Sequence, residues 1–346
     1  MNDRFHRLSL SAFSSFMIGS IFLSIPRSVQ WVTVGVAAPK TLNAGDHPIP
    51  TKGLPIIEKS EPTPGAHRAE VEAWRAKRIG SLKKDDGWLT LVGLFWLREG
   101  GNSFGADPKT NRIVFPEAAG SRPMGSLDLS QGLVTLRAEP DAGLTAGGRA
   151  VTTMALRSDT EGEPTLLRRG SVSFYLIKRG ERLGVRVKDS RNPALMAFHG
   201  IDSYPIDLEW RFGARFEAYP AGKTIPVPNI LGSVEQEKSP GAVVFDFGGR
   251  EFRIDAVTES GTEDLFLVFG DQTNGVETYG GGRFLYAAPA DKNGQVVLDF
   301  NKAYNPPCVF TPYATCPLPP TQNRLGIRIE AGEKTYAHST IDQLKD

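Results

Sequence analysis

This sequence has no excess of charge of one sign, and most of it has no apolar run long enough to span a membrane. Its 346 residues contain 40 Lys and Arg against 39 Asp and Glu, a formal net charge of +1. A chain so balanced has no global field to draw it onto nucleic acid or an anionic membrane. Beyond Ala38 no apolar run approaches the roughly 20 residues of a membrane-spanning helix. We therefore expect no nucleic-acid partner, and no membrane contact for the mature chain unless an N-terminal signal is retained.

Cysteine is also scarce, since Cys308 and Cys316 are the only two. Two thiols without a histidine pair nearby do not make a structural zinc site, so we expect no metal. A nucleotide-binding loop is incomplete because Glu217 stands where its first glycine is required, and we expect no cofactor. In an exported protein the two cysteines form one disulfide, worth about 2–3 kcal/mol, whereas in the cytoplasm they stay reduced.

The N-terminal segment has the three parts of a secretory signal peptide. Two arginines precede an interrupted apolar region, which ends in small residues at 35–38. Cleavage after Ala37 fits best, because cleavage one residue later places Pro39 next to the scissile bond. We predict a signal peptide over 1–37 and an exported, periplasmic protein, with an uncleaved signal anchor as the alternative.

Turn-forming residues are plentiful, with 37 Gly and 25 Pro. Residues 38–65 are rich in proline and have no hydrophobic period, which predicts a disordered tether. Apolar residues then recur at helical spacing over 66–84 and indicate one amphipathic helix. Short alternating segments separated by turns follow it, and they predict a mostly β protein with antiparallel sandwich or barrel layers.

Two hairpins give the clearest strand signals. Segments 171–178 and 182–188 flank an Arg-Gly-Glu turn, and segments 242–247 and 251–257 meet at Gly-Gly-Arg. Further strands are expected at 112–115, 133–138, 151–157, 210–218, 265–269, 283–287, 296–300 and 325–330.

The second strand of the first hairpin carries a basic face. Arg182, Arg186 and Lys188 alternate with apolar residues, and Arg179 stands at the turn. Successive side chains of a strand point to opposite faces, so these cations share one side. Such a face can hold an anionic ligand. Exposed charge is also normal on the outer face of an antiparallel sheet, and we favour that interpretation.

The densest polar grouping lies in the C-terminal part, among turn residues between Asp271 and Asn323. Varied polar side chains on a rigid scaffold are typical of a binding pocket, and the prolines between 306 and 320 restrict the loop that carries several of them. We predict a small-molecule ligand, anionic or polyhydroxylated, with Arg283 as its anchor. The expected ligand-binding residues are Arg283, Asp271, Tyr279, Asn301, Asn305 and Asn323.

Two alternatives remain open for the same cluster. A hydrolase would use Asp299 or Glu277 as its general base, with Arg283 or Tyr304 stabilising developing charge. A structural or protein-interaction module would use the polar side chains only to satisfy buried turns. Replacing Arg283 separates them, because only a structural arginine is needed for stability.

The C-terminal motifs resemble a bacterial family known as domain of unknown function 1684. The residues that carry the resemblance are Gly282–Leu285, Leu298–Cys308, Cys316–Pro320 and Asn323–Leu325, together with Gly87–Leu97 and Arg186–Asp189. The resemblance covers about residues 68 to 346. It implies an all-β architecture and a bacterial source, and it implies no activity.

A second likeness concerns residues 97–178, which are similar in rhythm to forkhead-associated domains. Those domains are β-sandwiches that bind phosphothreonine through loop residues. Here Ala106 and Met124 stand where that family's arginine and histidine are expected. The resemblance implies a β-sandwich in this region. We expect a helix plus that sandwich over 66–190 and a C-terminal β domain, which carries the polar cluster, over 191–346.

Overall fold

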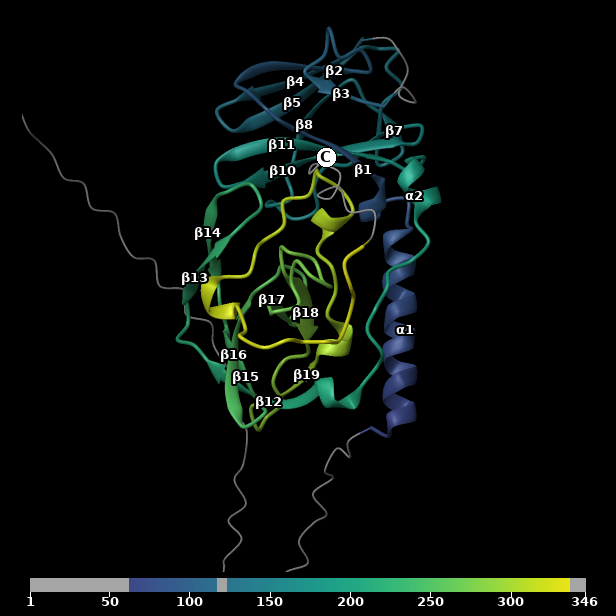
Figure 1. The fold of residues 1–346 in the computed structure, drawn as a ribbon. Helices are drawn as coiled ribbons and strands as arrows, with labels where there is room; N and C mark the ends of the chain where they lie inside the picture. The colour runs from purple at the N-terminus through teal and green to yellow at the C-terminus, as the bar shows by residue number, and fades with distance from the viewer. Residues whose placement is uncertain (1–61, 117–122, 337–346) are drawn as a thin grey trace, which may run out of the picture. The chain divides into compact units, whose positions relative to one another are not determined.

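A computed structural model describes residues 62–116 and 123–336. The predicted signal peptide and nearly all of the predicted tether lie outside the described residues. The described chain is mostly β-strand in antiparallel sheets, with one long helix near its start (Figure 1). This confirms the fold class expected from the sequence.

The helices are α1 Pro64–Leu82 and α2 Pro193–Ala197, with short 3₁₀ turns at η1 Trp88–Thr90, η3 Leu208–Trp210, η4 Phe300–Lys302, η5 Pro307–Val309 and η6 Thr321–Asn323. The strands are β1 Leu91–Trp96, β2 Gly100–Gly105, β3 Ile113–Val114, β4 Pro123–Ser130, β5 Leu133–Ala138, β6 Thr145–Ala146, β7 Arg149–Ala150, β8 Thr153–Leu156, β9 Leu167–Arg169, β10 Val172–Arg179, β11 Arg182–Asp189, β12 Arg211–Ala218, β13 Thr224–Pro228, β14 Val234–Lys238, β15 Gly241–Phe247, β16 Arg250–Val257, β17 Leu265–Phe269, β18 Arg283–Ala287 and β19 Gln295–Asp299.

Helix α1 begins two residues earlier than the sequence pattern predicts. Thr63 is the N-cap, and its hydroxyl accepts a hydrogen bond from the amide of Ala66 at 3.3 Å. Pro64 occupies the first turn, where its missing N–H costs nothing. The last two residues of the predicted tether therefore belong to the helix.

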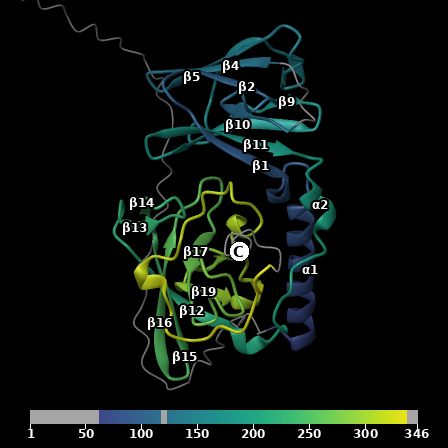
Figure 2. The same cartoon turned by 45° about the horizontal axis from the view of Figure 1, so that its top comes forward.

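Two sheets form a sandwich in the first half of the body (Figure 2). One sheet has the order β1-β11-β10-β9-β6-β7, and the other has the order β3-β2-β4-β5-β8. Their apolar faces share one hydrophobic core, in which the rings of Phe115 and Phe174 are 4.7 Å apart. The predicted hairpin is present as β10 and β11, which pair from Val172↔Asp189 to Arg179↔Arg182.

The second half is built on a sheet with the order β18-β17-β16-β15-β12-β19. Phe300 is fully buried in its core and contacts Phe212, Phe245 and Phe269. Helix α1 lies against this half, where Arg75 donates to the carbonyl of Tyr204 at 3.0 Å.

One expected strand is absent from the structure, and several observed strands, among them β2 and β4, have no counterpart among the expected segments. Residues 325–330 do not form a strand, because the carbonyl of Ile329 accepts a hydrogen bond from the Arg283 guanidinium instead of joining a ladder. The sequence pattern also missed the β13–β14 hairpin, because Pro226 and Pro228 lie inside β13. Proline is tolerated there since the hairpin is a two-stranded sheet with edges on both sides.

Candidate functional site

Arg283, the predicted ligand anchor, lies in the core of the second half. Its side chain is 0% exposed, and it donates to Oδ2 of Asp271 at 2.6 Å. The same guanidinium also donates to the carbonyls of Ile329 and Ala331. An arginine enclosed in this way has no surface to offer a ligand, so the structure supports a structural role and not the predicted anchor.

The predicted amide ligands also serve the backbone. Asn323 donates to the carbonyls of Asp255 and Val268, both at 2.9 Å, and thereby holds the η6 turn against two strands. Asn301 donates to the carbonyl of Asp207 at 2.7 Å, and Asn305 donates to the carbonyl of Lys334 at 2.7 Å. All three asparagines are buried. They stabilise turns and line none of the cavities described below.

The two candidate general bases form ion pairs with other side chains of the protein. Asp299 is buried, and its carboxylate lies 2.9 Å from His67 Nε2 and 3.5 Å from Arg211 Nη1. Glu277 forms an ion pair with Arg328 at 2.6 Å on the surface. Neither carboxylate lines a cavity that also holds Tyr304, so the structure does not assemble the predicted hydrolytic site.

Both cysteines are buried free thiols in the structure. The amide of Cys308 donates to Sγ of Cys316 at 3.2 Å, and the two side chains are themselves in hydrogen-bonding contact. The hydrogen bonds from Cys316 and from the predicted ligand residue Tyr279 lower the pKa of Cys308, while burial raises the pKa of Cys316. The thiols lie where the predicted disulfide would form, and the structure does not show that bond.

A cleft formed by two adjoining cavities is the candidate site. The cavities measure about 270 and 280 Å³. They adjoin because both are lined by Arg179, Glu259, Phe266, Thr315 and Pro317. Their walls come from the first-half sheet, from the β13–β14 hairpin, from β17 and β18, from α1 and from the loop that carries Cys316.

One of the two, which we call the basic cavity, has an aromatic wall. Phe266 on β17 pairs in register with Tyr286 on β18, and their rings stack at 4.9 Å. Tyr304 continues this row, with its ring 6.2 Å from that of Tyr286 and nearly parallel to it. The guanidinium of Arg78 from α1 lies 4.6 Å from the centre of the Tyr304 ring. Tyr304 is thus the one member of the predicted C-terminal ligand-binding and catalytic residues that lines the cleft.

Arg186 is the unusual cation of the basic cavity. It projects from β11, is 5% exposed, and has no ion-pair partner among the residues that the structure describes. Its guanidinium makes two long hydrogen bonds, from Nη1 to the hydroxyl of Tyr175 at 3.4 Å and from Nη2 to that of Thr315 at 3.3 Å, and its Nε has no partner. The guanidinium lies over Trp88 at 5.2 Å, which compensates part of its charge. Arg179 differs, because it forms an ion pair with Asp159 at 2.8 Å.

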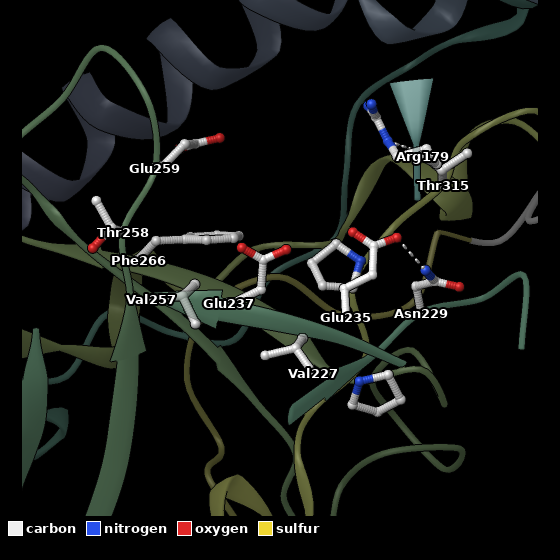
Figure 3. Close-up of a pocket in the computed structure, with 12 residues that line it drawn as sticks. Arg179, Val227, Asn229, Glu235, Glu237, Val257, Thr258, Glu259, Phe266 and Thr315 are labelled. Carbon is white, nitrogen blue, oxygen red and sulfur yellow. Dashed lines mark hydrogen bonds between the residues drawn. The ribbon is translucent and has the colours of Figure 1, made fainter. Parts of the chain in front are cut away.

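The other half, which we call the acidic cavity, contains three carboxylates. Glu235 and Glu237 lie two residues apart on β14 and therefore share a face, and Glu259 follows β16. In Figure 3 the carboxylates of Glu235 and Glu237 both point to the side where Arg179 and Glu259 lie. Glu235 accepts a hydrogen bond from Asn229 at 3.1 Å. Burial and the neighbouring Glu235 raise the pKa of Glu237.

The sequence signal for this cleft was the basic face of the β10–β11 hairpin. We took that face to be solvated, and Arg182 is indeed exposed, whereas Arg186 is buried against the second half. Trp88 belongs to one of the motifs of the family resemblance, whereas the lining residues Arg78, Glu235, Glu237, Glu259 and Thr315 belong to no motif that would single them out.

Neither a metal site nor a membrane span is evident in the described parts of the chain. Within 62–116 and 123–336, no three His, Cys, Asp or Glu side chains are placed to hold one ion. The helices in these same ranges fall short of the length and apolarity that crossing a bilayer demands.

Part of the chain matches the model of a known family. Residues 196–334 match the model of a family described as protein of unknown function (DUF1684), which confirms the resemblance over that range. A solution NMR structure of an uncharacterized protein from Haloarcula marismortui is 28% identical, with 41% of this chain and 80% of that chain covered and a TM-score of 0.35. That likeness is too distant to bear on fold or function. No curated protein matches the chain.

Proposed function

We propose that this protein, whose residues 196–334 form a DUF1684 domain, binds a small organic anion in the basic cavity. The observation that carries the proposal is Arg186, a guanidinium 5% exposed, without an ion pair among the described residues, that lines a cavity. A buried charge without a partner destabilises the folded state by on the order of several kcal/mol. An arginine kept in that state gains its partner when an anion binds.

The remaining lining defines the ligand further. Phe266, Tyr286 and Tyr304 form a row of rings that favours a flat or apolar body beside the anionic group. The cavity of about 280 Å³ is at the small end of ligand sites. Thr315 adds a hydroxyl within reach of both Arg179 and Arg186. A small aromatic carboxylate or phosphate ester has the required size and chemistry.

The test replaces Arg186 by methionine, which keeps the apolar stem and removes the charge. We expect the affinity for benzoate, phenylpropionate and phenyl phosphate, measured by calorimetry, to fall about 10- to 100-fold, because a charge-assisted hydrogen bond is lost. The melting temperature should stay unchanged or rise, since an unpaired buried charge is removed.

Arg182→Met is the matched control. Arg182 lies on the same strand, stacks over Trp96 at 4.0 Å and lines neither cavity. Its replacement should leave anion affinity unchanged. A lower melting temperature for Arg186→Met together with wild-type affinity would show that Arg186 is structural, and it would contradict the proposal.

We also propose that the protein is exported and that Cys308 and Cys316 then form a disulfide. The sequence of residues 1–37 supports export, and the contact between the two buried thiols supports the pairing. Denaturing mass spectrometry of protein recovered from the export compartment should show loss of the signal and of two hydrogen atoms.

Removing the disulfide gives a second readout. Cys316→Ser should lower the free energy of unfolding by about 2–3 kcal/mol in oxidising buffer, because the unfolded chain loses its cross-link. Reductant should lower the stability of the wild type by a similar amount and leave that of the variant unchanged. A wild type that is insensitive to reductant, with both thiols free to alkylation after unfolding, would refute the pairing.

A further inference from the structure

The two halves of the cleft carry opposite charge. Arg78 and Arg186 line only the basic cavity, and Glu235 and Glu237 line only the acidic cavity. Arg179 and Glu259 line both, and they mark the boundary. An anion that entered the acidic half would be repelled there, so the proposed anion site accounts for only half of the cleft.

Glu237 is the carboxylate of the acidic cavity that lacks a partner. Its neighbours are engaged, since Glu235 accepts from Asn229 and Glu259 accepts from the hydroxyl of Tyr286. Among the described residues the side chain of Glu237 has no hydrogen bond or ion pair, although the charge of Arg179, which lines the same cavity, favours its ionised form. It is therefore the acidic counterpart of Arg186, a half-buried charge that no described side chain of the protein pairs with.

The lining between these two charges suits a ligand that spans them. Phe266 lines both cavities, and Figure 3 shows its ring beside the Glu237 carboxylate. A ring face attracts an ammonium group and also packs against an aliphatic or aromatic spacer. Arg179 is already neutralised by Asp159 at 2.8 Å, so it presents a weak barrier at the boundary.

We infer that the ligand of this cleft is a zwitterion, with a carboxylate or phosphate at Arg186 and a primary ammonium at Glu237. The inference rests on the proposed function, because the anion site is its first half. A simple anion pairs with Arg186 and leaves Glu237 without a partner. A simple cation pairs with Glu237 and leaves Arg186 without one. Only a molecule that carries both charges, separated by a short apolar spacer, satisfies both.

The experiment compares matched probes with and without the amino group. The zwitterions are straight-chain ω-amino acids from γ-aminobutyrate to ω-aminooctanoate, and para-(aminomethyl)benzoate. Their counterparts are the carboxylates of equal length without nitrogen, and para-methylbenzoate. We expect at least one zwitterion to bind about tenfold or more tightly than its counterpart, because it adds a charge-assisted contact.

Glu237→Gln identifies the residue that recognises the ammonium. The variant should lose the advantage of the zwitterion and keep the affinity of the counterpart, with an unchanged melting temperature. Glu263→Gln is the control, because Glu263 is exposed and lines neither cavity. It should retain the full advantage.

The outcomes separate this inference from the proposed function. If the counterparts bind in an Arg186-dependent way and no zwitterion binds more tightly, the zwitterion inference is overturned and the anion site stands. An advantage that survives Glu237→Gln overturns the assignment of the ammonium to Glu237. If neither series shows Arg186-dependent binding, the proposed function fails, and the inference fails with it.

Discussion

Replacing Arg283 by alanine is expected to lower the free energy of unfolding by about 3–5 kcal/mol, because it leaves the Asp271 carboxylate buried without its counter-charge. The substitution also orphans the carbonyls of Ile329 and Ala331, which have no ladder partner of their own. For a chain of this size the melting temperature should fall by on the order of 10 °C. Calorimetric or fluorescence-monitored unfolding measures both quantities.

Two further variants test the cause of that loss. Arg283→Met combined with Asp271→Asn removes both charges and keeps an acceptor for the Thr273 amide, which donates to Asp271 at 2.8 Å. It should recover part of the lost stability, because no buried charge remains unpaired. Arg328→Ala breaks an exposed pair with Glu277 and should change stability little.

Ligand affinity completes the test of Arg283. At temperatures where Arg283→Ala is folded, benzoate should bind with wild-type affinity, since Arg283 lines neither cavity. A stable variant that had lost benzoate binding would instead restore Arg283 as the ligand anchor.

The β10–β11 hairpin was predictable because its signals are local. In β10 and β11 the alternation of apolar and polar residues and the Arg-Gly-Glu turn set both the limits and the register. The amphipathic pattern of α1 is equally local, and its true start depends on the cap at Thr63. β13 escaped prediction because a strand with two prolines is acceptable only at an edge, which depends on tertiary context.

The cleft was not predictable, because its residues meet only in the folded chain. Arg182 and Arg186 lie on the same face of β11 and have the same chemistry in the sequence. Arg186, unlike Arg182, meets the loop at Thr315, which is 129 residues away in the sequence. Conversely, Asp271 and Asn323 looked like a site because tight turns recruit the same residue types that bind ligands. The residue types in the sequence therefore indicated polar turns correctly, but they did not show whether those turns bind a ligand or stabilise the fold.

Substitution of Asp299 is a second test of whether the polar cluster is catalytic or structural. Its carboxylate joins distant elements, since it meets His67 of α1 at 2.9 Å, Arg211 of β12 at 3.5 Å and the side-chain amide of Asn301 at 2.9 Å. We expect Asp299→Ala to lower the free energy of unfolding by about 3–5 kcal/mol, because the Arg211 charge loses its buried partner. The measurement is again equilibrium unfolding.

The conservative variant Asp299→Asn distinguishes a structural carboxylate from a general base. Its amide oxygen still accepts from the backbone N–H of Asn301, which donates to Asp299 at 3.1 Å, so it should destabilise less than alanine does. A general base behaves oppositely, since Asn abolishes proton transfer as completely as Ala does while the fold is kept. Equal and small stability losses for both variants would contradict the structural role. A graded loss, with benzoate affinity unchanged in the folded variants, would establish that Asp299 fastens α1 to the sheet that forms one wall of the cleft.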